Sequence, residues 1–158
     1  MSALPAIVAA VPKVRFVSTG VTSLPGLGNL PSEVQDRVTL LPPMPAEEMV
    51  AVFKSSMLSV SPSLHDGTPN TLLEAMAAGC LPVVHPVESV LEWVTHGVNG
   101  VVIDANDVKS TARGIIRGLT DQRLRARAAV ANEGLVRGRA ERSTCRHQID
   151  DFYASIRR

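Results

Sequence analysis

The stretch from Leu58 to Val84, LSVSPSLHDGTPNTLLEAMAAGCLPVV, decides the fold of this chain. It predicts a buried strand over 58–60, a polar loop rich in Gly and Pro, a helix that follows Pro69 and closes at Gly79, and a second strand. In a parallel α/β sheet, ligands bind where loops leave the carboxyl ends of strands, and a helix that starts there aims free backbone N–H groups at an anion. The stretch therefore predicts a ligand site between its first strand and its helix.

Two acids flank the predicted start of this helix. Asp66 falls in the loop, and Glu74 follows eight positions later in the first turns of the helix, so that both carboxylates can face a ligand at the helix N-terminus. A purely structural interpretation is equally open on chemistry alone, because Thr71-x-x-Glu74 matches a capping box and Asp66-Gly67 is a common turn pair. The combination of loop, acid, helix start and second acid between two strands favours a functional site.

The rest of the chain predicts one α/β unit. Strands alternate with helices, which favours a Rossmann-like, doubly wound parallel sheet with helices on both faces. With 158 residues there is room for a single domain over 1–158. The Gly- and Pro-rich segment 22–32 is expected to be an exposed loop. The expected strands lie near 14–18, 38–41, 57–61, 82–85 and 100–103, and the expected helices near 3–11, 46–54, 69–79, 89–95, 107–119, 121–137 and 141–157.

Two linked motifs extend over residues 65–100. The run HDGTPNTLLEAMAAGCLPVV holds an acid, seven residues and a glutamate, then an Ala-Met-Ala helix end and a Pro-Val-Val strand. A second pattern, Glu-x-Val-x-x-Gly-x-Asn-Gly, is formed by Glu92, Val94, Gly97, Asn99 and Gly100. Together the motifs resemble the donor-binding signature of retaining glycosyltransferases of the GT-B fold, the group 1 or family-four class. The resemblance runs from about Val14 to the C-terminus and implies an incomplete C-terminal, nucleotide-sugar-binding domain of that fold.

The resemblance implies a role for each matching residue in holding a nucleotide-sugar donor. Glu74 would accept hydrogen bonds from the ribose hydroxyls. Asp66 would be the catalytic residue beside the donor sugar, where it would position the sugar or support an oxocarbenium-like charge. Backbone N–H groups at the positive end of the helix would hold the diphosphate without a metal, and no cofactor beyond the donor is implied. The implied donor-binding residues are Gly67, Asn70, Thr71, Leu72 and Glu74. Many relatives carry a Gly-Gly pair where residues 87–89 read Val-Glu-Ser, which leaves sugar contacts at that position open.

The resemblance also implies a first strand, followed by a loop that supplies an Arg and a Lys to the diphosphate. Neither this strand nor these two basic residues has a match in the sequence. Residues 4–11 form a short apolar stripe typical of a helix. We therefore expect the chain to begin within the helix that follows this first strand in the family, and to lack the amino-terminal acceptor-binding domain. That strand would be central in a sheet of order 3-2-1-4-5-6, between the strands at 14–17 and 58–60. Because unpaired buried backbone groups are costly, we expect these two strands to pair directly, or a second chain to lend a strand through self-association.

Composition and charge narrow the class of protein. The formal net charge is +1, from 16 Lys and Arg against 15 Asp and Glu, which gives no general attraction to nucleic acid. No run approaches the ~20 apolar residues of a membrane span and no signal peptide is visible, so we expect a cytoplasmic protein. Contact of the Arg-rich end of the chain with a membrane surface stays open. The two Cys and four His lack metal-ligand spacing, which predicts reduced thiols and no bound metal.

The sequence thus predicts the nucleotide-sugar-binding half of a retaining glycosyltransferase, which transfers a sugar from a nucleotide diphosphate to an acceptor. One alternative is a non-catalytic nucleotide-diphosphate-binding module, or a subunit that needs a separate acceptor-binding partner. A second is a doubly wound domain of another class, such as a flavodoxin-like or nucleotide-sugar epimerase relative, in which both acids are structural. The spacing of the two acids disfavours this last class. The unmatched Arg and Lys favour the module for the isolated chain.

Overall fold

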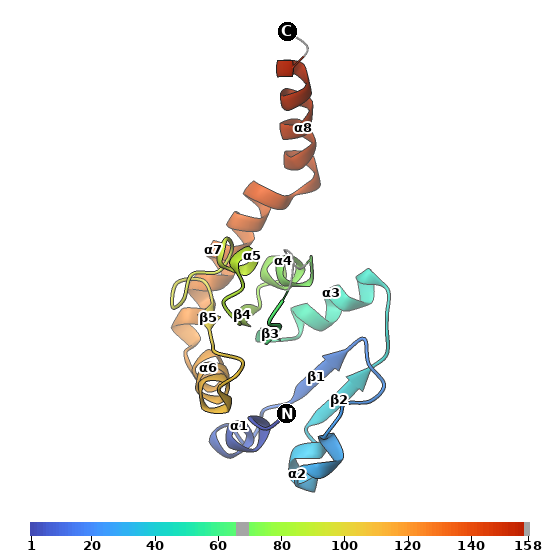
Figure 1. The fold of residues 1–158 in the computed structure, drawn as a ribbon, viewed down its shortest axis with the longest axis vertical. Helices are drawn as coiled ribbons and strands as arrows, with labels where there is room; N and C mark the ends of the chain where they lie inside the picture. The colour runs from blue at the N-terminus through green and yellow to red at the C-terminus, as the bar shows by residue number, and fades with distance from the viewer. Residues whose placement is uncertain (66–69, 157–158) are drawn as a thin grey trace.

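The computed structural model describes residues 1–65 and 70–156, whose elements are drawn in Figure 1. The strands are β1 (Phe16–Thr19), β2 (Val38–Leu41), β3 (Leu58–Ser61), β4 (Leu81–Val84) and β5 (Val101–Val102). The helices are α1 (Leu4–Ala10), α2 (Ser32–Gln35), α3 (Ala46–Lys54), α4 (Asn70–Ala77), α5 (Glu88–Leu91), α6 (Val108–Thr120), α7 (Gln122–Ala140) and α8 (Arg142–Ile156), with a 3-10 turn η1 (Leu27–Asn29).

Each expected strand and helix is present near its expected position. The Gly- and Pro-rich segment is largely exposed and contains only η1, as the sequence predicts. The sequence gives no sign of α2, because a single helical turn is too short to show a period. This turn is held by the buried side chain of Val34 and by Gln35, whose Nε2 donates to the carbonyl of Leu30 at 2.7 Å.

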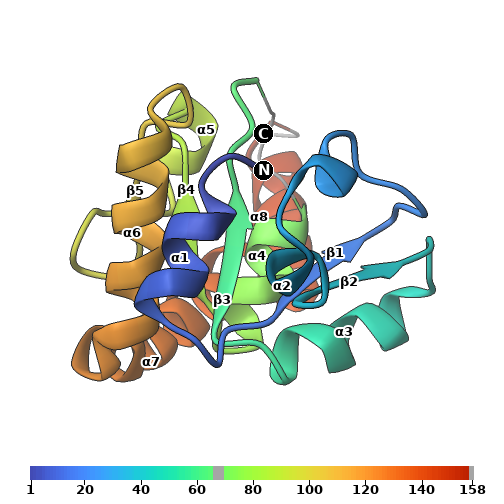
Figure 2. The same cartoon turned by 90° about the horizontal axis from the view of Figure 1, so that it is seen from below.

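All strand pairs are parallel, and they form two separate ladders. Phe16 of β1 lies opposite Val38 of β2, while Leu58 of β3 lies opposite Leu81 of β4, which also pairs with β5. Figures 1 and 2 place β1 between β2 and β3. The spatial order is therefore β2, β1, an open position, β3, β4 and β5. This is the doubly wound order 3-2-1-4-5-6 without its first strand, so the predicted fold class is confirmed.

The expectation that the strands at 14–17 and 58–60 pair directly is wrong. Among the described strands, β1 has a ladder only with β2, and β3 only with β4. Packing of side chains joins the two ladders instead: α1 packs on α6, and Ile7 and Val14 belong to the same core cluster as Leu81 and Val83. The edges of β1 and β3 that face each other are therefore linked through side-chain packing on one face of the sheet, without a ladder of hydrogen bonds between them.

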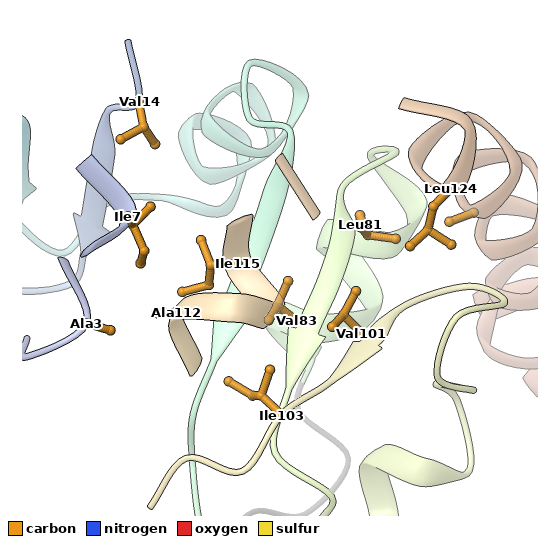
Figure 3. Packing of buried hydrophobic residues seen from close by; sticks show 11 residues of the cluster. Ala3, Ile7, Val14, Leu81, Val83, Val101, Ile103, Ala112, Ile115 and Leu124 are labelled. Carbon is orange, nitrogen blue, oxygen red and sulfur yellow. The ribbon is translucent and has the colours of Figure 1, made fainter. Parts of the chain in front are cut away.

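Figure 3 shows this core, in which residues of α1 meet residues of β4, α6 and the start of α7. Ile7 and Leu81 are completely buried, and burying a side chain of this size stabilises a fold by about 1.5–3 kcal/mol. A second cluster lies under α4 and α5 and contains Met76, Val84 and Trp93. Val83 belongs to the first cluster and the adjacent Val84 to the second, so the two clusters lie on opposite faces of the sheet.

The Arg-rich end of the chain is only partly exposed to solvent. In α7, Leu124, Ala128 and Asn132 are buried, and this face packs on α4. By contrast, none of the described residues of α8 is buried, and Figure 1 shows that helix projecting away from the sheet. In the described part of the chain, no helix combines the length and apolarity needed to cross a bilayer.

Candidate functional site

The candidate site lies where β3 leads into α4. Because β3 and β4 are parallel, the helix between them runs back along the sheet, and its N-terminus lies at the carboxyl edge of the strands. β3 ends at Ser61, α4 begins at Asn70, and Gly79, with a φ of +90°, closes the crossover as predicted. Asp66 and Gly67 lie outside the described residues, so their predicted roles remain predictions.

The N-terminus of α4 is exposed and carries no negative charge of its own. Asn70 and Thr71 are exposed, and the first turn contains no acidic residue. The first N–H groups of a helix have no partner within the helix, and they carry a partial positive charge. Leu72 is 3% exposed, and its side chain anchors this end of the helix in the core. The three predicted main-chain donors thus stand at a fixed and accessible helix start.

Glu74 lies on the exposed face of α4, one turn after Asn70. Positions four apart share a helix face, and Ala75 and Met76 occupy the buried face. The Glu74 side chain forms no hydrogen bond or ion pair with any residue that the structure describes. The capping-box interpretation needs Thr71 at the N-cap, but the helix already includes Asn70, so Thr71 lies inside it. Glu74 is therefore available to a ligand.

Neighbouring strand ends border the same edge. His85 follows β4, and its Nδ1 accepts a hydrogen bond from the N–H of Ala105 at 3.2 Å. A neutral ring with this bond carries its proton on Nε2. Where relatives of the resembled class carry a Gly-Gly pair, Val87 is the extended N-cap of α5. The chain at this position therefore leads from an extended N-cap residue into a short helix, and no side chain caps that helix.

The second motif forms a buried set of hydrogen bonds between Asn99 and Asn132, here called the clamp, rather than a surface open to a ligand. Asn99 Oδ1 accepts from the N–H of Thr95 at 2.7 Å, and Asn99 Nδ2 donates to the carbonyl of Trp93 at 2.8 Å. The same amide nitrogen donates to Asn132 Oδ1 at 2.8 Å, and Asn132 Nδ2 donates to the Asn99 carbonyl at 3.0 Å. Asn99 and Asn132 are 6% and 0% exposed, so the bonds between these two residues are made away from water. The clamp ties the loop before β5 to α7.

Gly100 next to this clamp is required by space. A Cβ at this position would lie 2.5 Å from Val94 Cγ1 and 3.0 Å from the carbonyl oxygen of Pro82. Real Cβ atoms essentially never show a contact as short as the first distance, and the second is tighter than nearly all of them. The Asn-Gly end of the second motif therefore lets the loop lie directly on β4.

Trp93 is buried, and it meets a residue to which the local sequence does not point. The guanidinium of Arg139 lies 4.2 Å from the centroid of the indole ring, and its Nη1 donates to the Glu92 carbonyl at 2.8 Å. Within the described residues, Trp93 Nε1 is the buried side-chain polar atom that lacks a hydrogen-bond partner. Arg139 and Asn132 were missed because each comes from α7, far from its partner in sequence.

Both cysteines are free thiols in the structure. Cys80 is buried and donates to the carbonyl of Phe53 at 3.1 Å, and burial raises the pKa of this thiol to about 11. Cys80 is therefore a small residue of the core, and its thiol is reduced as the sequence predicts. No group of three or more His, Cys, Asp or Glu side chains close enough to hold a metal ion occurs among the residues the structure describes.

Comparisons with known proteins agree on the family and on the fold. The family described as "Glycosyl transferases group 1" matches residues 30–134. D-inositol 3-phosphate glycosyltransferase of Mycobacterium ulcerans is 30% identical over 162 aligned positions, which cover 96% of this chain and 34% of that protein. The chain thus spans about a third of the length of this relative.

Two solved structures share the fold over nearly the whole chain. Sucrose-phosphate synthase from Thermosynechococcus elongatus has a TM-score of 0.81 at 20% identity, covering 98% of this chain and 41% of its own. HepE from Anabaena, solved in complex with UDP-glucose, has a TM-score of 0.78 at 20% identity, covering 98% and 44%. At such identities these likenesses show the fold alone. The match to the family covers more than half of the chain, and this protein therefore belongs to the group 1 glycosyl transferases.

Proposed function

We propose that this chain binds a nucleotide-sugar donor at the N-terminus of α4 and serves as the donor-binding half of a retaining glycosyltransferase. The observation that carries the proposal is the start of α4, an exposed helix N-terminus without an acid in its first turn. One turn later stands the exposed Glu74, which pairs with none of the residues that the structure describes. Membership in the group 1 family supports the same assignment.

The first step of the proposal concerns the diphosphate. The N–H groups of Asn70, Thr71 and Leu72 point out of the helix start, where the partial positive charge favours an anion. These donors are held in place because Leu72 is packed in the core. Stabilising negative charge on the departing nucleotide diphosphate is the contribution by which fixed dipoles lower a transfer barrier.

The second step concerns the ribose. A carboxylate accepts two hydrogen bonds from neighbouring hydroxyls, and Glu74 lies on the helix face that carries Asn70. With the ribose hydrogen-bonded to Glu74, the attached diphosphate would lie at the start of the helix, one turn away. Hydrogen bonds to a charged group contribute about 1.5–3 kcal/mol each, so this residue should dominate recognition of the nucleoside.

The third step is the transfer of the sugar. Asp66, outside the described residues, is proposed to lie beside the donor sugar and to support the oxocarbenium-like charge as the anomeric bond to the diphosphate breaks. Retention follows if the acceptor oxygen bonds to the face from which the diphosphate leaves. The site that binds the acceptor is proposed to belong to a separate acceptor-binding partner.

Ligand-observed NMR and calorimetry with UDP-, GDP- and ADP-sugars test the donor assignment. UDP-glucose comes first, because HepE was solved with it. We expect weak binding, roughly high micromolar, and a loss of about tenfold or more in Glu74→Ala from the missing charged hydrogen bonds.

Asp36→Ala provides the matched control. Asp36 is also an exposed carboxylate, but it follows α2 directly before β2 and so lies at the opposite edge of the sheet. Its removal should leave donor affinity unchanged. Equal affinity of wild type and Glu74→Ala, or an equal loss in both variants, would refute the ribose assignment.

A non-catalytic nucleotide-diphosphate-binding module is the second candidate. The observation that favours it is the exposed, acid-free start of α4, which can bind a diphosphate whether or not an acceptor is present. Release of UDP from UDP-glucose, measured with and without acceptor extracts, separates the two. Binding of the donor without release in either condition supports the module, whereas acceptor-dependent release supports the transferase.

A further inference from the structure

Arg139 joins the end of α7 to the end of α5. Its guanidinium lies 4.2 Å from the centroid of the Trp93 ring, and its Nη1 donates to the carbonyl of Glu92 at 2.8 Å. Glu92 is the C-cap of α5. The carbonyls at the end of a helix lack partners within it and carry a partial negative charge, so they attract a cation. One exposed side chain therefore makes two contacts with the same distant segment.

The Trp93 ring has little else to fix its orientation. Trp93 is 8% exposed, and its Nε1 has no hydrogen-bond partner within the described residues. A buried indole usually finds a partner for this N–H. Here the ring is held by its apolar neighbours in the second core cluster and by the positive charge over its face. In the described part of the chain, Arg139 is thus the polar group that orients the ring.

The same ring lies in the cluster that holds the start of α4. Leu72 is 3% exposed, and it shares the second core cluster with Trp93 and with Val90 of α5. The residues of α7 that pack against this cluster are Leu135, Val136 and Ala140. The start of α4 therefore rests on both α5 and α7. Arg139, next to Ala140 in sequence, connects these two supports.

α4 and α5 begin at the same edge of the sheet. β3 and β4 are neighbouring parallel strands, so the loops that follow them both leave at the carboxyl edge. The N–H of His85, directly after β4, donates to the carbonyl of Ser61 at 3.2 Å, which keeps the two loop starts together. α4 then begins at Asn70 and α5 at Glu88. The relative position of the two helix starts therefore depends on how the far end of α5, at Glu92, is held.

We propose that Arg139 is a positioning residue for donor binding, which holds α5 and Trp93 against α7 and thereby fixes the start of α4. This inference rests on the proposed function, because the donor diphosphate is proposed to bind there. The clamp ties Asn99 to α7 as well, so the segment 92–99 is held to α7 at both ends. Without Arg139 the end at Glu92 is free to shift against the cluster. Hydrogen bonds weaken steeply when their geometry is lost, so a small shift of α4 lowers donor affinity.

Calorimetry with UDP-glucose tests this role. We expect Arg139→Ala to raise the Kd by about threefold to tenfold, the change expected when hydrogen bonds from α4 to the diphosphate lose their geometry. Arg139→Lys keeps a cation for the ring and the carbonyl but lacks the planar fork, so it should bind the donor more tightly than Arg139→Ala.

Arg137→Ala is the matched control. Arg137 is also an exposed arginine of α7, but its guanidinium pairs with Glu133 of the same helix at 2.8 Å. Its removal should leave the Kd unchanged. An equal rise of the Kd in Arg137→Ala and Arg139→Ala would overturn the positioning role, because a general loss of positive charge would then explain both.

NMR signals of the isotope-labelled chain without ligand give a readout that does not depend on the donor. Arg139→Ala should shift the indole N–H signal of Trp93 and, with it, the backbone N–H signals of residues 70–72 at the start of α4. Arg137→Ala should shift neither. A residue that only stabilises the fold would lower the unfolding temperature and leave both the α4 signals and the Kd unchanged.

The outcomes separate this inference from the proposed function. If the wild type binds none of the UDP-, GDP- and ADP-sugars, the proposed function fails, and the signals of residues 70–72 still decide whether Arg139 fixes the start of α4. The positioning role is overturned if Arg139→Ala shifts the Trp93 signal but not the α4 signals. It is also overturned if the wild type binds the donor and Arg139→Ala binds it equally well.

Discussion

The Asn99–Asn132 clamp makes the sharpest prediction for stability. Asn132→Ala removes a bond at 2.8 Å from Asn99 Nδ2 and one at 3.0 Å to the Asn99 carbonyl, and it leaves both Asn99 groups buried without those partners. Each such group costs about 1–3 kcal/mol, so the free energy of unfolding should fall by about 2–6 kcal/mol. For a domain of this size the loss corresponds to about 5–20 °C in Tm.

Thermal and urea unfolding, followed by circular dichroism, measure this loss. Asn29→Ala is the control, because Asn29 is an exposed residue at the end of η1 and should change stability by less than about 0.5 kcal/mol. The double variant with Asn99→Ala should lose much less than the sum of the single losses, since both act on the same bonds. Additive losses, or an Asn132→Ala variant as stable as the control, would refute the clamp.

Three further predictions follow from single contacts. Gly100→Ala should destabilise the fold by about 1–3 kcal/mol in urea unfolding, because its Cβ would meet Val94 Cγ1 at 2.5 Å. A thiol reagent at pH 8 should modify half-buried Cys145 first, because the pKa of Cys80, raised by burial to about 11, keeps that thiol protonated; equal rates in the folded chain would contradict this. Arg125→Ala should lower Tm by a few degrees, because its Nη1 donates to the last carbonyls of α6 at 2.6 and 2.7 Å, whereas exposed Arg123→Ala should not.

The donor site is largely a matter of local sequence. A strand, a loop, a helix start and a glutamate one turn later lie within 58–77, so their periodicity and spacing predicted α4 and the positions of Asn70 and Glu74. Local sequence did not decide whether Glu74 belongs to a capping box or is free to bind a ligand. The answer depended on the residue at which the helix begins, and a sequence pattern does not fix that boundary.

The sequence by itself determined the order of strands and helices, the parallel fold class and the family motifs, because each depends on residues close together in the chain. Only the tertiary structure decided that β1 and β3 do not pair, that Asn132 completes the clamp on Asn99, and that Arg139 covers Trp93. These contacts join segments tens of residues apart. Their geometry comes from the packing of α1 and α7 around the sheet, which no local period encodes.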